Sequence, residues 1–526
     1  MKLDLSLYLV TDSTPSILGN KDLCEVVEKA IKGGVTIVQY RDKHSDTNVL
    51  VSTASKLHEI TQKYNVPLII NDRIDVALAV GAEGVHIGQD DMRIEEARKF
   101  LRYGTIIGVT VSSTEEAIAA VKGGASYLGI GTVYATPTKT NTKSIIGPAG
   151  VRKILASISQ LEPKVGTVAI GGINLENVQR ILYQSRSANK SLDGVAVVSA
   201  IISAPEPQDA ASSFSTAISR DPPFALNPPP QRKNAPRVSE VSDLLDDVDA
   251  IVRDVAISSP LCHNMINFVV ANFAANVALA IGASPIMSGN GAEAADLAKN
   301  NGALFVNMGT LNNDSIPNYL KAMRAYNARG NPVVFDPVGA GATQVRRDAV
   351  KQLMAGGYFD LIKGNESELQ QVYGRAASHQ VGVDSGPSTL DANEKATMVR
   401  NLALEERTVV LLTGPVDYLS DGWRTIAIEN GHPLLGRVTG TGCIIGTITA
   451  AFLAVHKKDK LLAALSGLLM FEVAAERAAA HDSVRGPGSF VPALIDELAL
   501  LSTEAAEWTE SKTIQEAARI KFIQLP

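Results

Sequence analysis

Short apolar runs recur at near-regular intervals in the amino-terminal part of the chain, and this periodicity constrains the fold more than any other feature. The eight runs are Leu5–Val10, Val35–Gln39, Val66–Ile70, Gly84–Ile87, Thr105–Val109, Tyr127–Ile130, Val165–Ile170 and Gly194–Val198. Amphipathic stretches such as 49–64 and 175–182 lie between them. Strands that alternate with helices favour parallel pairing, and eight such units in succession predict an α/β fold, a closed (β/α)8 TIM barrel, within residues 1–220.

Polar residues follow seven of the predicted strands, at the ends where a barrel of this kind carries its functional groups. The strand ends contribute Gln39, Arg41, Lys43, Asn71, Asp72, Asp91, Thr110, Thr136, Lys139, Gly172 and Ser199. Asp72 and Asp91 follow neighbouring strands, so their carboxylates can share a Mg²⁺ ion whose shell a substrate phosphate completes. Gly172 and Ser199 occupy the place where barrels commonly bind phosphate. The sequence therefore predicts one site for two anionic groups.

Each of these features also has a structural interpretation when it is taken alone. Asp72 could cap a helix that starts near Arg73, and Gly171-Gly172 could form a plain turn. His86 could be a packed core histidine. The joint arrangement on one rim favours the functional interpretation.

The strand-end blocks resemble the signature motifs of thiamine-phosphate synthase over residues 5–200. The matching blocks are 38–43, 70–73, 84–91, 136–139 and 170–173. In that family a pyrimidine diphosphate loses pyrophosphate by C–O cleavage, and the thiazole nitrogen captures the resulting cation. Thr110 departs from the usual bacterial pattern, because it replaces a serine but keeps the hydroxyl group.

The resemblance implies a role for each matched residue. Mg²⁺ is expected at Asp72 and Asp91. The pyrimidine diphosphate is expected to contact Gln39, Tyr40, Arg41, Asp42, Lys43, Asn71, Thr110 and Lys139. The thiazole phosphate is expected to contact Thr136, Pro137, Thr138, Gly172, Val198 and Ser199.

A proline-rich stretch interrupts the periodic pattern. Residues 221–237 contain six prolines and almost no periodic apolar residues, so we expect an extended linker. Strand-like runs and helices alternate again in residues 238–526, which predicts a second, layered α/β domain. We expect helices over 238–255, 267–281 and most of 442–480, strands over 303–307, 332–336, 361–363 and 408–413, and a loop of no assignable chemistry over 373–400.

Three motifs of the second domain stand at predicted strand ends. Asp336 precedes a glycine-rich turn, and Lys363 precedes Glu368 by five residues. The third motif, 438–443, ends in Gly440-Thr441-Gly442-Cys443 and opens a helix whose N–H groups can face an anion. Such a turn can stabilise a transferring phosphoryl group while Asp336 and Glu368 position Mg²⁺, although no P-loop motif is present.

These motifs resemble hydroxyethylthiazole kinase, a member of the ribokinase-like fold, over residues 258–510. Supporting matches are 261–264, 282–287, 307–310, 412–414 and 486–490. The resemblance implies that Cys443 accepts the substrate hydroxyl proton, and that Met287 and Gly440 contact the thiazole alcohol. It also implies that Lys363 and Thr413 contact ATP.

Cys443 and His263 leave alternatives open. A cysteine among small residues at a helix start is often a packing residue. Within this motif Cys443 becomes a candidate base, because a helix N-terminus is expected to lower the pKa of the thiol. His263 could line the pocket or support it.

Charge and composition narrow the class of partner. The formal net charge of −6 gives no general attraction for nucleic acid or anionic membranes, and no apolar run reaches the ~18 residues of a membrane span. We therefore expect a cytoplasmic bifunctional thiamine-biosynthesis enzyme with small-molecule substrates and, by analogy with kinase relatives, a homo-oligomer built on trimers. Two alternatives are a fused sugar-phosphate barrel with a sugar kinase, and a thiazole-binding regulatory module without catalysis.

Overall fold

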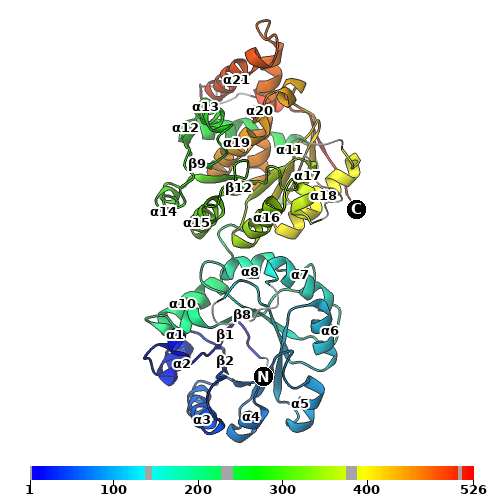
Figure 1. Ribbon diagram of the computed structural model, residues 1–526. Helices are drawn as coiled ribbons and strands as arrows, with labels where there is room; N and C mark the ends of the chain where they lie inside the picture. The colour runs from blue at the N-terminus through cyan, green and yellow to red at the C-terminus, as the bar shows by residue number, and fades with distance from the viewer. Residues whose placement is uncertain (1–2, 137–144, 227–240, 375–387, 508–511, 526) are drawn as a thin grey trace. The chain divides into compact units, whose positions relative to one another are not determined.

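The computed structural model describes residues 3–136, 145–226, 241–374, 388–507 and 512–525. The chain divides into two compact units, Met1–Pro222 and Pro223–Pro526, shown in Figure 1. Among the described residues, no helix combines the length and the apolar character that a membrane span requires. Pro137, Thr138 and Lys139 of the predicted site lie outside the described residues.

The first unit is a closed barrel of eight parallel strands, which confirms the predicted fold. The strands are β1 (Leu7–Val10), β2 (Ile37–Tyr40), β3 (Leu68–Asn71), β4 (Gly84–Ile87), β5 (Ile106–Val111), β6 (Tyr127–Ile130), β7 (Gly166–Ile170) and β8 (Gly194–Val197). The barrel closes where β8 pairs with β1, in the register that sets Leu7 opposite Val195. The helices are α1 (Pro15–Leu18), α2 (Leu23–Lys32), α3 (Thr47–Lys63), α4 (Ile74–Val80), α5 (Ile94–Phe100), α6 (Thr114–Lys122), α7 (Gly147–Ile158), α8 (Val178–Gln184), α9 (Ser199–Ile202) and α10 (Pro207–Ile218).

Alternation along each strand divides the barrel core into two layers. Leu7, Leu9 and Val38 face outward and pack among the helices. Tyr8 and Ile37 face inward and pack in the barrel interior. Successive side chains of a strand point to opposite faces, so each strand buries apolar residues on both sides.

The second unit is built on a nine-stranded sheet in the order β10-β9-β11-β12-β13-β14-β15-β16-β17. The strands are β9 (Leu261–Met265), β10 (Ser284–Ile286), β11 (Ala303–Asn307), β12 (Val333–Asp336), β13 (Leu361–Gly364), β14 (Val409–Leu412), β15 (Asp417–Ser420), β16 (Thr425–Ile428) and β17 (Ile520–Phe522). Strands β9 to β14 pair in parallel, whereas β15, β16 and β17 pair antiparallel. The layered α/β prediction is confirmed, and the antiparallel edge was not foreseen.

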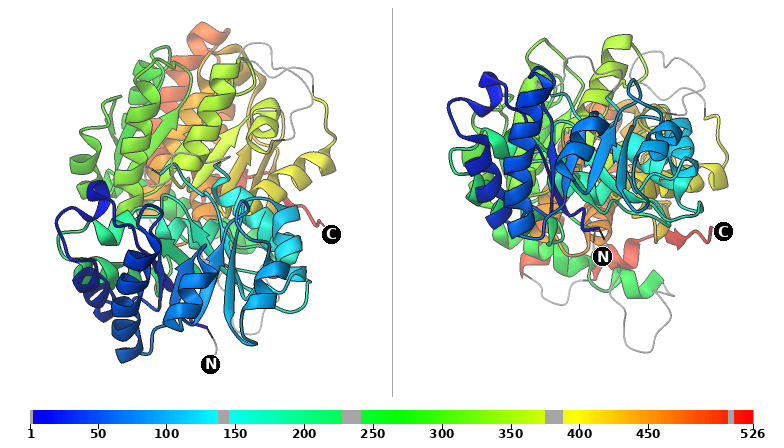
Figure 2. Two further views of the ribbon diagram at one scale, coloured as in Figure 1. Left: turned by 60° about the horizontal axis from the view of Figure 1, so that its bottom comes forward. Right: turned by 90° about the horizontal axis from the view of Figure 1, so that it is seen from below.

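Helices cover both faces of this sheet (Figures 1 and 2). One face packs against α12 (Val248–Ser258), α13 (Ala271–Ala280), α19 (Thr441–Val455), α20 (Lys460–Ala480) and α21 (Pro487–Glu507). The other packs against α15 (Ser315–Ala328), α16 (Gln344–Gly356) and α18 (Ala392–Glu406). The remaining helices are α11 (Val241–Leu245), α14 (Ala294–Leu297), α17 (Glu366–Val372), α22 (Thr513–Ala517) and two 3₁₀ turns, Ala298–Asn300 and Pro433–Arg437.

Three predicted segments need correction. The described part of the helix predicted over 238–255 is divided between α11 and α12. The helix predicted from residue 267 begins only at Ala271. The loop predicted over 373–400 is wrong for its last part, because α18 starts after Asp391. Asp391 and Glu394 form a capping box there, which satisfies N–H groups that the helix start would otherwise leave unpaired.

The start of the predicted linker is part of the second unit. The Phe224 ring is buried and stacks on Tyr358, with 4.4 Å between ring centroids. Lys460 Nζ donates to the Phe224 carbonyl at 2.6 Å and pairs with Asp360. Residues 223–226 are therefore docked rather than extended, and residues 227–240 lie outside the described part of the chain.

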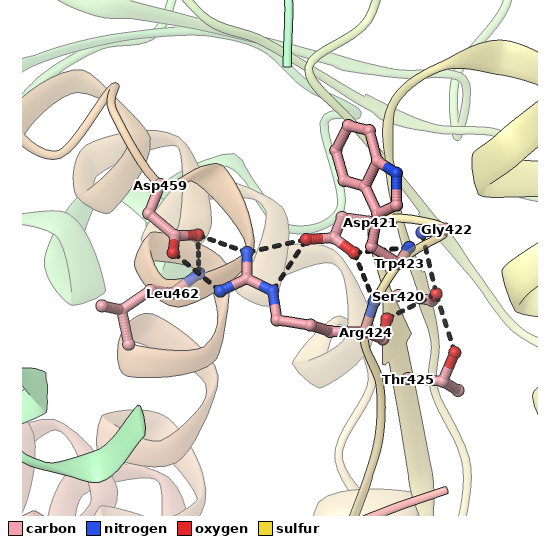
Figure 3. Close-up of polar contacts among 8 residues, drawn as sticks. All are labelled: Ser420, Asp421, Gly422, Trp423, Arg424, Thr425, Asp459 and Leu462. Carbon is pink, nitrogen blue, oxygen red and sulfur yellow. Dashed lines mark hydrogen bonds and ion pairs between the residues drawn. The ribbon is translucent and has the colours of Figure 1, made fainter. Parts of the chain in front are cut away.

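A buried arginine joins the β15–β16 turn to α20 (Figure 3). The Arg424 guanidinium donates two hydrogen bonds to Asp459 and two to the Asp421 carboxylate. Asp459 also caps α20 by accepting from the Leu462 N–H at 3.0 Å. Because Arg424 donates hydrogen bonds to both carboxylates, Arg424, Asp421 and Asp459 can stay charged inside the fold.

Candidate active sites

A cavity of about 530 Å³ lies at the carboxyl ends of the barrel strands. The predicted residues that line it are Gln39, Arg41, Lys43, Asn71, Asp72, Asp91, Thr110, Thr136, Gly172, Val198 and Ser199. The barrel therefore brings most of the described predicted residues to one place. Gly172 has a φ of +67°, and a Cβ there would lie 2.6 Å from the Ala135 carbonyl oxygen, so the loop requires glycine.

Tyr40 and Asp42 do not line this cavity, contrary to the contacts expected from the resemblance. Tyr40 follows Gln39 on β2 and faces the opposite side, where it is buried among the outer helices. Asp42 accepts hydrogen bonds from the Ser13 hydroxyl and from the His44 and Ser45 N–H groups. These two residues support the strand end rather than face the cavity.

Two carboxylates and a lysine meet at the cavity rim. Lys43 Nζ lies 3.0 Å from Asp72 Oδ2, and the Asp72 and Asp91 side chains hydrogen bond to each other. Burial and the Asp91 hydrogen bond raise the pKa of Asp72. Burial opposes ionisation of Asp91 as well, but hydrogen bonds from Asp72 and the Gly88 N–H hold the pKa of Asp91 below its ordinary value.

This carboxylate pair fits a hard cation. Within the described ranges no cluster of three or more acidic, histidine or cysteine side chains forms a metal centre of its own. Mg²⁺ is commonly held by one or two carboxylates together with water and substrate phosphate, so two aspartates on one rim are sufficient protein ligands. Asp72 has a φ of +61°, which is uncommon for a residue with a side chain.

A chain of buried polar groups crosses the floor of the cavity. His86 Nε2 lies 2.8 Å from Thr110 Oγ1, and His86 Nδ1 lies 2.9 Å from the Tyr127 hydroxyl. Burial lowers the pKa of His86 to about 4. The Tyr127 hydroxyl lies 2.6 Å from that of Tyr8, which accepts from Gln39 Nε2 at 2.8 Å. Sequence reasoning missed Tyr8 and Tyr127, whose only signal is a phenol at an inward-facing strand position.

The second candidate site lies at the carboxyl ends of β11, β12 and β13 and the start of α19. Lys363 Nζ lies 3.0 Å from Asp336 Oδ2, and both side chains are buried. Asn307 Nδ2 donates to the same oxygen at 2.9 Å. Asn267 Nδ2 donates to Asn307 Oδ1 at 2.9 Å and lies 3.7 Å from Cys443 Sγ. This network brings three predicted residues together and adds two asparagines.

One carboxylate oxygen of Asp336 is not used by the hydrogen bonds of this network. Its Oδ1 atom is buried and has no hydrogen-bond partner among the described residues. Burial raises the pKa of Asp336, and Lys363 opposes that rise. An orphaned buried carboxylate oxygen is costly unless a ligand engages it, so Oδ1 fits a position for a cation or substrate proton.

Cys443 lies in the first turn of α19, but the expected lowering of the pKa of its thiol is wrong. Burial, together with the negative charge of Asp336, raises the pKa of Cys443 to about 12. The preceding Gly440 has a φ of +89°, and a Cβ there would meet Val270 Cγ1 at 2.0 Å.

Glu368 is held by the backbone on both oxygens. Oε1 accepts from the Gly339 N–H and Oε2 from the Asn365 N–H, each at 2.9 Å. Burial and the nearby Asp336 raise the pKa of Glu368 to about 7. Glu368 therefore ties the glycine-rich turn after β12 to the start of α17, and its expected role as a metal ligand stays a prediction.

The other predicted kinase residues have distinct settings. Met287 follows β10 and is 36% exposed, and the Thr413 N–H donates to the Gly364 carbonyl at 2.9 Å. His263 is fully buried, and its Nε2 lies 2.9 Å from the Ser288 carbonyl oxygen, which is a supporting position. Their expected contacts with substrates remain predictions.

Sequence reasoning assigned no role to Asn267, Asn307 or Arg346. Asn307 ends β11 and Asn267 follows the end of β9 by two residues, and this position near a strand end is the signal that could have identified them. Arg346 donates to the carbonyl oxygens of Met308, Gly309 and Val338 and so holds two strand-end loops together.

Comparisons with known proteins assign both units. A family model described as thiamine monophosphate synthase matches residues 7–201, and the hydroxyethylthiazole kinase family model matches residues 252–504. The probable thiamine biosynthetic bifunctional enzyme of Schizosaccharomyces pombe is 42% identical, over 98% of this chain and 99% of its own. The chain belongs to the family of thiamine biosynthetic bifunctional enzymes.

Other relatives match the whole chain or one of its units. The thiamine biosynthetic bifunctional enzyme of Saccharomyces cerevisiae is 36% identical over 97% of this chain and 98% of its own. A solved hydroxyethylthiazole kinase from Pyrococcus horikoshii is 36% identical and covers 53% of this chain and 99% of its own, with a TM-score of 0.46. The chain is thus a thiamine-phosphate synthase and a hydroxyethylthiazole kinase, and its kinase half takes ATP as co-substrate. The sugar-kinase and regulatory alternatives are set aside.

Proposed function

We propose that the kinase unit phosphorylates 4-methyl-5-(2-hydroxyethyl)thiazole with ATP, and that the barrel joins the product to hydroxymethylpyrimidine diphosphate. The barrel reaction yields thiamine phosphate and pyrophosphate. The observation that carries the proposal is the pairing of Asp72 and Asp91 beside Lys43 on the rim of one large cavity. This rim carries both the ligands for a cation and the positive charge that a diphosphate requires.

In the barrel, the chain's residues bind and orient the leaving group. Asp72 and Asp91 would hold Mg²⁺, which when bound neutralises charge that develops on pyrophosphate. Lys43 and Arg41 line the same cavity and add positive charge there. Lys139 is proposed to do the same. No strong protein nucleophile is required, because the thiazole nitrogen attacks the carbon that pyrophosphate leaves.

The thiazole phosphate is proposed to bind across the cavity from this rim. Gly172, Val198 and Ser199 line that side, with Thr136 from the loop after β6. Gly171 and Gly172 both have positive φ and carry no side chain, so a phosphate could approach the backbone closely there. Pro137 and Thr138 are proposed to complete this side.

In the kinase unit, Cys443 is proposed to accept the proton of the thiazole alcohol as the thiolate. A cation held at Asp336 would favour that form, because it would offset the negative charge that helps to raise the pKa of the thiol. The Cys443 sulfur lies beside Asn267 and close to Asp336, at the start of the helix that opens after the Gly440 turn. Asp336 and Glu368 are proposed to position Mg²⁺, with the free Oδ1 of Asp336 as the best-suited atom. Lys363 and Thr413 are proposed to contact ATP, and Met287 and Gly440 the thiazole alcohol.

A stepwise assay tests the proposal. The full chain is given ATP and the thiazole alcohol, then the pyrimidine diphosphate, and products are resolved by mass. We expect thiazole phosphate in the first step and thiamine phosphate with pyrophosphate in the second. Formation of thiazole phosphate without thiamine phosphate would contradict the barrel half of the proposal.

Assembly and location are further parts of the proposal. We infer a homo-oligomer built on trimers of the kinase unit, and a cytoplasmic protein. The exposure of Met287, a predicted substrate contact, supports a site that another subunit could complete. Mass measurement of the native protein and microscopy of a tagged chain test these two statements, and a monomer or a membrane-associated protein would contradict them.

A further inference from the structure

The polar groups on the floor of the barrel cavity form one unbranched hydrogen-bond chain. It runs from Gln39 through Tyr8, Tyr127 and His86 to Thr110, with heavy-atom distances of 2.8, 2.6, 2.9 and 2.8 Å. The five residues come from five different strands. Tyr8 and Tyr127 are buried in the barrel interior, whereas Gln39 and Thr110 stand at the two ends of the chain and line the cavity.

The orientation of the Gln39 amide and a count of hydrogens together give this hydrogen-bond chain a direction. Gln39 Nε2 donates to the Tyr8 oxygen. If Tyr127 also donated to Tyr8, the hydrogen of the Tyr8 hydroxyl would be buried without an acceptor among the described residues, since Gln39 and Tyr127 are its only partners there. Buried donors without acceptors are disfavoured, so Tyr8 donates to Tyr127 and Tyr127 donates onward to His86 Nδ1.

The same count fixes the histidine tautomer. A neutral imidazole carries one hydrogen, and Nδ1 already accepts, so the hydrogen resides on Nε2 and is donated to Thr110 Oγ1. Burial keeps the imidazole neutral near pH 7, in agreement with its low pKa. The Thr110 hydroxyl then has its own hydrogen available for the cavity. Gln39 donates one of its two amide hydrogens to Tyr8, and its amide oxygen remains available as an acceptor.

We propose that Tyr8, Tyr127 and His86 are positioning residues that set the polarity of the cavity floor, with Thr110 as donor and Gln39 as acceptor. This inference rests on the proposed function of the barrel. A floor of this polarity selects a ring edge that combines an acceptor nitrogen with an amino donor, as an aminopyrimidine has. A pyrimidinone, in which an oxo group and a ring N–H replace these groups, presents the opposite pattern.

The polarity at the two ends is coupled through the chain. If the Gln39 amide were turned over, every hydrogen bond would reverse, Nδ1 of His86 would carry the hydrogen, and Thr110 would become an acceptor. The two directions are therefore distinguished by one proton on one ring. No other arrangement satisfies all five groups.

The first test reads that proton directly. Nitrogen NMR of the full chain labelled with ¹⁵N-histidine, near pH 7, distinguishes a ring nitrogen that carries hydrogen from one that does not. The His86 signals are assigned by their absence in His86→Gln. We expect hydrogen on Nε2 and none on Nδ1. Hydrogen on Nδ1, or a charged ring, would overturn the proposed direction.

The second test asks whether Tyr127 sets the polarity of the cavity floor or has only a structural role. Binding of the aminopyrimidine diphosphate and its pyrimidinone analogue is measured by calorimetry with Mg²⁺ and without thiazole phosphate. Tyr127→Phe removes the hydroxyl group that links Tyr8 to His86 and so interrupts the hydrogen-bond chain. We therefore expect affinity for the aminopyrimidine to fall about tenfold and its advantage over the pyrimidinone to shrink by a similar factor. Tyr134→Phe is the matched control, because the Tyr134 hydroxyl is buried and has no partner among the described residues.

The outcomes are distinct. If Tyr127→Phe weakens both ligands equally and leaves their ratio unchanged, Tyr127 has only a structural role and the inference fails. If the wild-type chain binds neither ligand, the proposed function of the barrel fails instead. If Tyr127→Phe does not fold, Tyr8→Phe interrupts the hydrogen-bond chain between Gln39 and Tyr127 instead. The NMR test needs no variant of either tyrosine.

Discussion

Asp72 and Asp91 lie beside each other at the rim of the barrel cavity, where Lys43 Nζ lies 3.0 Å from Asp72 Oδ2. Two carboxylates so close together repel each other, and a divalent cation bound between them would remove that repulsion. The two residues that are proposed to bind the cation therefore come from successive βα units of the sequence. Neighbouring parallel strands end at the same rim, and the rim is where both side chains meet.

Replacement of Asp91 by asparagine should stop the barrel reaction. Asp91→Asn keeps the size of the side chain and removes one negative charge from the cation site, so we expect pyrophosphate release to fall by at least about a hundredfold, in line with the several kcal/mol that a metal ion supplies. Kinase activity should be unchanged. Asp75→Asn, an exposed aspartate paired with Arg73, is the control and should retain both activities.

Replacement of Cys443 should affect the kinase alone. Cys443→Ala is expected to lower kinase kcat by about 10²–10⁴, the range of a positioned general base, with little effect on the barrel reaction. Cys443→Asp should retain substantial activity. Steady-state kinetics with the thiazole alcohol measure both variants, and an unchanged kcat in Cys443→Ala would make the residue a packing residue.

The free energy of unfolding should fall as the pH is lowered, because His86 is buried in its neutral form. Its folded pKa is about 4, below the ordinary 6.5, so the unfolded chain takes up the proton first. This loss begins as the pH falls below about 6.5, grows until about 4, and reaches ~3 kcal/mol at most. His86→Gln should show a shallower decline than the wild type in calorimetric melting between pH 7 and 4. Parallel curves would contradict the buried, neutral state of His86.

Arg424 should be essential for the stability of the kinase unit. Arg424→Met leaves the Asp421 and Asp459 carboxylates without their shared partner (Figure 3), and we expect a loss of about 3–5 kcal/mol in the free energy of unfolding. Urea denaturation measures it. The control Lys521→Met breaks an exposed pair with Glu429 and should cost at most about 1 kcal/mol.

The alternation of strands and helices could be predicted because it depends on patterns within short stretches of sequence. Buried parallel strands are short apolar runs, and their carboxyl ends meet whatever the details of packing. Gln39 and Asp72 were therefore placed correctly in one cavity. Tyr40 could not be, since a motif block does not say which of two neighbouring residues faces inward.

The remaining features depend on partners distant in the chain. The thiol of Cys443 is governed by Asp336, which lies more than a hundred residues earlier. Tyr8 and Tyr127 are 119 residues apart and carry no motif. Phe224 docks on Tyr358 although the prolines around it favour an extended linker. No local pattern encodes such contacts, because they arise when separate elements pack together.

The most direct test of the whole account is complementation between two single-site variants. Asp91→Asn and Cys443→Ala are each incubated with ATP, the thiazole alcohol and the pyrimidine diphosphate, separately and mixed, and thiamine phosphate is measured by mass. Asp91→Asn alone should accumulate thiazole phosphate, Cys443→Ala alone should leave the alcohol largely unconverted, and the mixture should form thiamine phosphate. Failure of the mixture, with both variants folded, would contradict two independent sites joined by a released intermediate.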